Sequence, residues 1–128
     1  MSVTRRGFLG STLLSLGVTA SAASRELELD RFFIAGFQFH EGPRLLGQLR
    51  AGDRLVLRAE QDNPYDAGAV RLEFEGRHVG YVPRSCNAVP GRLLAQNVPL
   101  CGRIMTVDVT AEPWHAVEVA VTLPTWGS

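Results

Sequence analysis

Apolar and polar residues alternate along much of the chain, and this pattern predicts short β-strands with one buried face. Glycine, proline, asparagine and aspartate, which favour turns, separate the alternating runs. The predicted strands, in chain order, cover residues 31–40, 54–60, 69–74, 77–82, 100–110 and 115–123. Residues 24–30 form either a linker or a short additional strand. Six short strands joined by turns indicate a mainly β domain, a small OB-like or SH3-like barrel.

The alternation also assigns residues to faces, because successive side chains of a strand point to opposite sides. In the first predicted strand, one face carries Phe33, Ala35, Phe37 and Phe39. The opposite face carries Ile34 and Gln38, and Gly36 between them indicates a bulge or a close approach of another backbone. In the fourth predicted strand, Val79 and Tyr81 share one face, and His78 and Gly80 share the other. The shared faces of the remaining strands are Leu55, Leu57 and Ala59 in the second, Val70, Leu72 and Phe74 in the third, Cys101, Arg103, Met105, Val107 and Val109 in the fifth, and Val117, Val119, Val121 and Leu123 in the sixth.

Two connections between these strands have recognisable chemistry. Glu75-Gly76 is typical of a tight hairpin turn between the third and fourth strands. One helix is expected between the fourth and fifth strands, ending near residue 97. Ser85 or Asn87 could cap its N-terminus, and Pro90 falls in the first turn, where proline is tolerated.

The N-terminal segment has the pattern of an export signal. Residues 4–9 contain Arg5 and Arg6 and resemble the twin-arginine motif of bacteria. A mildly apolar run follows, shorter than the roughly 20 residues that span a bilayer, and then the small residues 20–22 that a signal peptidase accepts. We therefore expect a signal helix over residues 1–23, contact with the membrane only during export, and a periplasmic or secreted protein. The alternative is a retained segment or a misassigned start, with a cytoplasmic protein.

Composition limits the chemistry that the domain can perform. All thirteen basic residues are arginines and thirteen residues are acidic, so the net charge is zero and any anion site must be local. In an oxidising compartment Cys86 and Cys101 could form a disulfide, closing a loop of about 15 residues worth about 3 kcal/mol; alternatively they are two small buried thiols. The three histidines show no metal-type spacing with them, so no metal or cofactor is expected and we assign the histidines no chemistry.

Two runs gather the polar and aromatic side chains that could bind a ligand, residues 60–66 and residues 80–84. Pro64 stiffens the first run, and a stiff loop presents its side chains with little ordering cost. An aromatic ring, a carboxylate and a guanidinium close together suit a base, a sugar hydroxyl and a phosphate. The alternative is an ordinary turn beside a strand end, in which Asn63 and Asp66 only bond to the backbone. No nucleophile–base pair or phosphate-binding glycine loop is recognisable, so we do not expect an enzyme.

The order and spacing of four motifs resemble the HIRAN domain: Ile34–Phe37, Gly52–Leu57, Asp62–Val70 and Val79–Arg84. The resemblance covers residues 31–123, which leaves residues 124–128 as a tail. It implies a modified OB-like barrel. It also implies a non-catalytic module that, in the DNA-remodelling relatives, captures single-stranded DNA at a 3′ end.

The resemblance further implies roles for individual residues. Tyr65 would stack on a base, Asp66 would accept a hydrogen bond from the terminal 3′ hydroxyl, and Arg84 would hold a phosphate. Phe39 would be a second stacking platform. The remaining candidate residues near the ligand are Gln38, Asn63, Tyr81 and Trp114. Gln38 stands where the DNA-capturing relative carries an arginine, which removes one phosphate contact. Phe39 and Tyr81 could instead be core aromatics, and Arg84 a solvated charge.

Three functions follow from these observations. The first is a nucleic-acid-binding module with a single-stranded partner. The second is an exported module that uses the same groove for a periplasmic protein or another ligand. It is motivated by the export signal and by the net charge of −2 that remains when Arg5 and Arg6 are removed with the leader. The third is a zinc-binding or hydrolase-associated protein, although no domain that would supply such an activity is recognisable in this sequence.

Overall fold

The computed structural model describes residues 26–124. The predicted signal helix with Arg5 and Arg6, and the tail after residue 124, lie outside the described residues. The described residues form six strands: β1 (Glu26–Phe33), β2 (Arg54–Ala59), β3 (Val70–Phe74), β4 (Arg77–Tyr81), β5 (Cys101–Val107) and β6 (Val117–Pro124). The predicted mainly β architecture is confirmed, and residues 26–30 belong to a strand rather than a linker.

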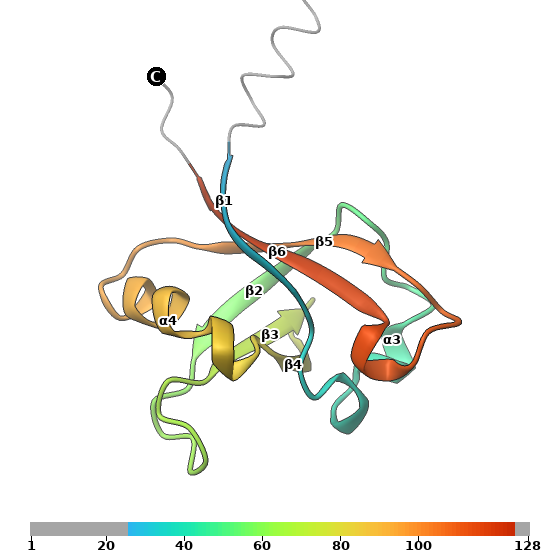
Figure 1. The fold of residues 1–128 in the computed structure, drawn as a ribbon, viewed down its shortest axis with the longest axis horizontal. Helices are drawn as coiled ribbons and strands as arrows, with labels where there is room; N and C mark the ends of the chain where they lie inside the picture. The colour runs from blue at the N-terminus through green and yellow to red at the C-terminus, as the bar shows by residue number, and fades with distance from the viewer. Residues whose placement is uncertain (1–25, 125–128) are drawn as a thin grey trace, which may run out of the picture. The chain divides into compact units, whose positions relative to one another are not determined.

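The strands form one sheet in the order β1-β6-β5-β2-β3-β4, which curls on itself (Figure 1). Ala35, just after β1, exchanges two backbone hydrogen bonds of 2.9 Å with Tyr81 on β4. Because β1 and β4 are the two edges of the sheet, this bridge brings the edges together and nearly closes a barrel.

The predicted helix is α4 (Ala88–Ala95), and a second, shorter helix is α3 (Gly42–Leu45). Three 3-10 turns complete the described elements: η2 (Phe37–Phe39), η3 (Arg84–Cys86) and η4 (Pro113–His115). Among the described residues, no helix combines the length and the apolar character needed to cross a bilayer.

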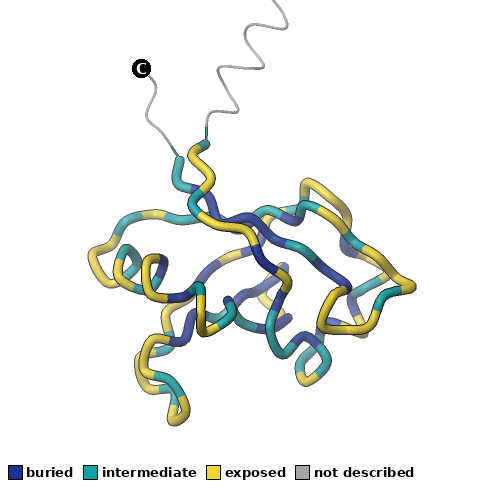
Figure 2. Tube along the Cα trace, in the orientation of Figure 1, coloured by how far each residue is buried: buried dark blue, intermediate teal, exposed yellow. Residues whose placement is uncertain are grey.

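The core lies inside the curled sheet, and most of it follows the predicted alternation (Figure 2). The predicted inward residues of β2, β3 and β6 that are buried are Leu55, Leu57, Val70, Leu72, Phe74, Val117, Val119 and Val121. Ala59, predicted on the same face of β2, is exposed, and Leu123 at the end of β6 is half-buried. The hairpin prediction is also confirmed, because Glu75 and Gly76 both have positive φ, 49° and 83°, as a two-residue turn that matches the strand twist requires.

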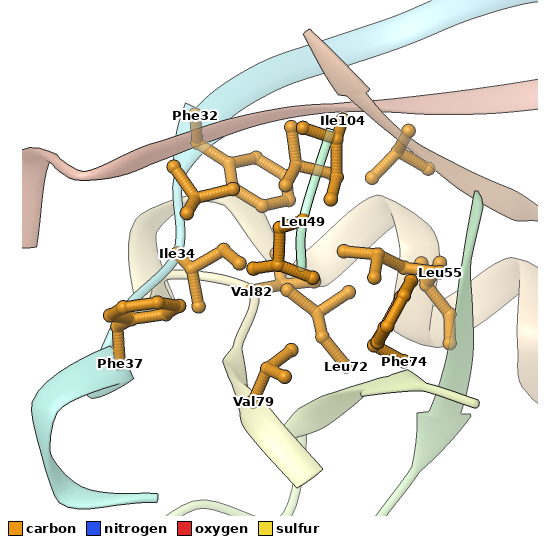
Figure 3. Close-up of a cluster of buried hydrophobic side chains, with 14 of the residues drawn as sticks. Phe32, Ile34, Phe37, Leu49, Leu55, Leu72, Phe74, Val79, Val82 and Ile104 are labelled. Carbon is orange, nitrogen blue, oxygen red and sulfur yellow. The ribbon is translucent and has the colours of Figure 1, made fainter. Parts of the chain in front are cut away.

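The faces predicted for the first strand are wrong. Phe32, Ile34 and Phe37 are buried in the core (Figure 3), whereas Phe33 and Phe39 are exposed. The reason is Gly36, whose φ of +69° ends the extended run and turns the chain into η2. The alternation therefore runs inward at even positions through Ile34 and is lost afterwards.

The faces predicted for the fourth strand are also wrong. Leu72 pairs with Gly80 and Glu73 pairs with His78, so Val79 is an extra residue on β4 and forms a β-bulge. One extra residue exchanges the two faces for all residues beyond it. Val79 and Gly80 are both buried, and His78 and Tyr81 come to the same side of the strand.

The fifth strand is shorter than predicted and faces the other way. It ends at Val107, and Val109 is exposed in the following loop. The buried residues are Gly102 and Ile104 rather than the set that begins at Cys101, and the register with β6 shifts again between Ile104 and Thr106. This shift lies after Ile104, so it brings Val107 against the core but does not explain why Gly102 and Ile104 face inward.

Both cysteines are free thiols in this structure, so the disulfide is not formed here. The two sulfurs have different neighbours: Arg54 donates a hydrogen bond of 3.1 Å to Cys101 Sγ, whereas Cys86 Sγ lies 3.7 Å from Ser85 Oγ. Both thiols are partly buried, and their pairing in an oxidising compartment stays a prediction.

Candidate functional site

Two segments extend from the same end of the sheet (Figure 1). Residues of both line a pocket of about 640 Å³. One segment is the loop between β2 and β3, and the other follows β1. The end of β4 and the residues after it complete the wall. The lining residues are Ala35, His40, Glu60, Asp62, Asn63, Pro64, Tyr65, Asp66, Ala69, Tyr81, Val82 and Arg84. Five of the eight predicted ligand-binding residues therefore lie around one pocket.

Asn63 holds the loop in shape. Its Oδ1 accepts hydrogen bonds from the backbone N–H of Tyr65, at 2.8 Å, and of Asp66, at 3.0 Å. Its Nδ2 donates to Glu60 Oε1 at 3.1 Å, which ties the loop to the end of β2. Tyr65 follows on the loop with 85% of its surface exposed, so its ring is free to stack on a ligand.

Glu60 lines the pocket. It belongs to the run 60–66 that the sequence singled out, but it was not among the eight predicted ligand-binding residues. Its Oε1 accepts a hydrogen bond of 2.8 Å from the Tyr81 hydroxyl, and Arg71 Nη1 lies 3.4 Å from Oε2. Burial alone would raise the pKa of Glu60, but the hydrogen bonds from Asn63, Tyr81 and Arg71 outweigh burial and lower it. The carboxylate is thus ionised, and Tyr81 is a bound wall residue rather than a free stacking ring.

Asp66 and Arg84 stand together at the rim. Asp66 Oδ1 accepts from the Gly68 backbone N–H at 2.9 Å, Oδ2 accepts from Asn87 Nδ2 at 2.8 Å, and Arg84 Nε lies 3.5 Å from Oδ2. These donors, the Gly68 N–H above all, lower the pKa of Asp66. Arg84 also donates to the Tyr65 carbonyl at 2.7 Å, yet its side chain is mostly exposed. The rim thus presents an ionised acceptor beside a guanidinium.

Asn87 has a different role from the one predicted. It occupies the N-cap position of α4, but its side chain makes no capping hydrogen bond there. The amide instead reaches across to Asp66. It therefore anchors the binding loop to the helix, a contact between residues 21 positions apart in the chain.

Two histidines to which the sequence assigned no role lie in contact with each other and with Tyr81. The rings of His40 and His78 stack with centroids 3.9 Å apart, and Tyr81 meets both edge-on, at 5.5 and 4.9 Å. His40 lines the pocket. Burial is the main cause that lowers the pKa of each imidazole. The sequence did not reveal this cluster because unbroken alternation places His78 and Tyr81 on opposite faces. The bulge at Val79 brings them to the same side.

Three predicted residues do not line the pocket. Phe39 on η2 and Trp114 on η4 are exposed by 78% and 49%, on turns that lie against each other. Phe39 is therefore not a core aromatic. Gln38 has a buried Oε1 without a hydrogen-bond partner among the described residues, so this oxygen faces the protein rather than the pocket.

The HIRAN domain family model matches residues 29–124, which confirms the resemblance. The chain is similar to a crystal structure of a protein from Lactobacillus plantarum, at 23% identity and a TM-score of 0.67, over 77% of this chain and 94% of that chain. It is also similar to the crystal structure of the HIRAN domain of human HLTF, at 15% identity and a TM-score of 0.60, over 75% of this chain and 74% of that chain. No curated protein sequence matches. At these identities the structural likenesses show a shared fold.

Proposed function

This chain belongs to the HIRAN domain family, and we propose that it is a non-catalytic module that holds a single strand of nucleic acid by its 3′ end. Family membership supports nucleic-acid binding in general. The observation that carries the finer proposal is the arrangement of Tyr65, Asp66 and Arg84 around one pocket. Tyr65 offers a ring on which a base can stack, Asp66 offers a hydrogen-bond acceptor, and Arg84 offers hydrogen-bond donors for a phosphate. All three border the same pocket.

Each side chain has one task in this proposal. A base stacks on the exposed ring of Tyr65, an interaction worth about 1–3 kcal/mol. Arg84 donates to the phosphate of the last linkage. The ionised Asp66 accepts a hydrogen bond from the terminal 3′ hydroxyl and would repel a phosphate at the same place. The preference for an end therefore comes from the negative charge of Asp66, which its lowered pKa maintains also at mildly acidic pH.

Binding of oligothymidylates that differ only at the 3′ end tests the proposal, with fluorescence anisotropy as the readout. We expect the free 3′ hydroxyl to bind more tightly than a 3′ phosphate. Tyr65→Ala should weaken binding about 5- to 150-fold, the equivalent of the stacking energy. Val109→Ala, which shortens another exposed apolar residue away from the pocket, is the matched control. Equal affinity for both ends would reject end capture, and no binding of either would reject the nucleic-acid function.

We also propose that the protein is exported, a proposal that rests on the residues around Arg5 and Arg6. Export receptors read the arginine pair as an address rather than as a charge. Arg5→Lys combined with Arg6→Lys should therefore leave a longer precursor in the cytoplasm. Cell fractionation and intact mass measure this, and a full-length wild-type protein in the cytoplasm would reject export.

A further inference from the structure

The proposed contacts leave two stacked imidazoles unused: His40, which lines the pocket, and His78, which stacks on it. His78 Nε2 lies 3.1 Å from the Gly80 carbonyl oxygen. A carbonyl oxygen only accepts, so Nε2 carries the hydrogen and His78 is held in one orientation. The His40 ring stacks on His78 and borders the pocket, and no group among the described residues hydrogen-bonds to it. His40 therefore has both ring nitrogens available to a ligand in the pocket, and His78 keeps Nδ1, so either ring can accept a proton.

The charges around the pocket are unfavourable for an anion at neutral pH. Among the described lining residues, the carboxylates of Glu60, Asp62 and Asp66 outnumber the one guanidinium, that of Arg84. Glu60 and Asp66 are compensated in part by their hydrogen bonds. The lining nevertheless carries more negative than positive charge when the imidazoles are neutral. A phosphate-bearing ligand would gain from one further positive charge on the wall.

We propose that the His40–His78 pair is a proton-linked anion-binding element, which takes up one proton when a phosphate-bearing strand enters the pocket and so makes binding tighter at lower pH. This inference rests on the proposed function and adds the regulation of the same site. The pair acts as a unit. Two imidazolium rings with centroids 3.9 Å apart would repel each other, so the pair accepts one proton rather than two.

The surroundings of the pair support neutral rings in the free protein. Burial lowers the pKa of His40 and of His78, and the nearby Arg71 guanidinium lowers both further. The negative charge of Glu60 acts in the opposite direction and raises the pKa of both rings. The other ionisable groups that face the pair are the Tyr81 phenol and the Glu41–Arg77 ion pair.

The sign of the linkage follows from these pKa values. In the free protein the rings are neutral at neutral pH, because their pKa values lie below the usual value of about 6.5. A bound phosphate favours the protonated form and raises the pKa. Affinity therefore increases as the pH falls through the window between the bound and the free pKa. At pH values below both pKa values, the affinity no longer changes with pH.

The test measures the affinity of a 3′-hydroxyl oligothymidylate from about pH 8 to about pH 5.5, a range that spans the ordinary histidine pKa. Thymine and the phosphodiester do not titrate there, so a change reports the protein. A nearby charge shifts a pKa by about 1 or more, so we expect affinity to rise about tenfold as the pH falls. Calorimetry in two buffers with different ionisation enthalpies should show the uptake of up to one proton.

Variants locate the proton. His40→Gln and His78→Gln should each flatten the pH dependence and reduce the proton uptake, whereas His115→Gln should leave both unchanged. His115 is the matched control because its ring packs on Phe33, away from the pocket. The imidazole resonances of the wild type, followed by NMR, give a second measure that needs no variant. His40 should titrate at a higher pH with the strand bound.

Each outcome decides one of the two proposals. Tight binding that is independent of pH, without proton uptake, would overturn the role of the histidine pair and leave end capture standing. A pH dependence that survives in both His40→Gln and His78→Gln would overturn it as well. No binding at any pH would reject the proposed function, and this inference with it.

Discussion

Replacing Asn63 by alanine should destabilise the domain and weaken ligand binding together. The substitution removes two hydrogen bonds that hold the loop backbone and one that reaches Glu60. Each such bond contributes about 1 kcal/mol net. Water replaces part of this because Asn63 is half-buried, so we expect the free energy of unfolding to fall by about 1–2 kcal/mol. For a domain of about 100 residues this lowers Tm by about 5–10 °C.

The comparison with Pro64→Ala separates two explanations of the stiff loop. Sequence reasoning attributed the stiffness to Pro64, whose replacement acts mainly through the unfolded chain and costs about 0.4–1 kcal/mol. In the structure, three hydrogen bonds of the Asn63 side chain hold the loop in its conformation. Asp62→Ala is the stability control, because the Asp62 side chain has no hydrogen bond or ion pair among the described residues. We therefore expect Asn63→Ala to be the most damaging of the three.

Urea unfolding followed by circular dichroism gives the free energies, and anisotropy with the 3′-hydroxyl oligothymidylate gives the affinities. Asn63 is expected to act on binding through the position of Tyr65, so Asn63→Ala should weaken binding about tenfold at a temperature where the variant remains folded. An Asn63→Ala protein within about 0.3 kcal/mol of the wild type would refute the hydrogen-bond account. A larger loss for Pro64→Ala would return the stiffness to the proline.

Two further predictions concern stability. Gly80→Ala should cost more than about 3 kcal/mol, because φ is +145° and the added Cβ would collide with Ile34 and approach a backbone carbonyl oxygen at 2.6 Å. Gly47→Ala, at a position with open space, should be close to neutral in the same urea experiment. The lowered pKa values of Glu60 and Glu73 predict a loss of stability as the pH falls below about 4.5, where the unfolded chain takes up protons first. Unfolding free energies that stay constant from neutral pH to about pH 3 would contradict this assignment.

Much of the fold could be predicted because strands and turns depend on the types and spacing of residues close together in the sequence. Alternation located the strands from β2 to β6, whereas the first strand, predicted over residues 31–40, is β1 at Glu26–Phe33. It also named the buried face of β2, β3 and β6, where no extra residue interrupts the period of two. The turn at Glu75-Gly76 was predictable from residues that tolerate positive φ. The polar loop around Asn63 was recognised because its residue types carry their own turn chemistry.

Other features, above all which residues of β1 and β4 face the core, depended on where the two-residue alternation is interrupted. Gly36 ends the extended run, so Phe37 enters the core although Phe33, placed on the same face by the alternation, is exposed. The bulge at Val79 exchanges the faces of β4 for the residues beyond it. Period-two alternation assumes an unbroken strand, and a single added residue reverses every later assignment. Nothing in the local sequence marks which residue will be the extra one.

The sequence by itself determined the family, the strand content and the loop that presents Tyr65. Only the tertiary structure decided that Glu60 holds Tyr81, that Asn87 anchors Asp66, and that His40 stacks on His78. These partners lie 21, 21 and 38 residues apart in the chain. The His40–His78 contact arises because the curled sheet brings its two edges together. Glu60 meets Tyr81 because β2 and β4 both flank β3, and Asp66 meets Asn87 because the β2–β3 loop lies beside the start of α4. No local run of residues specifies such proximity.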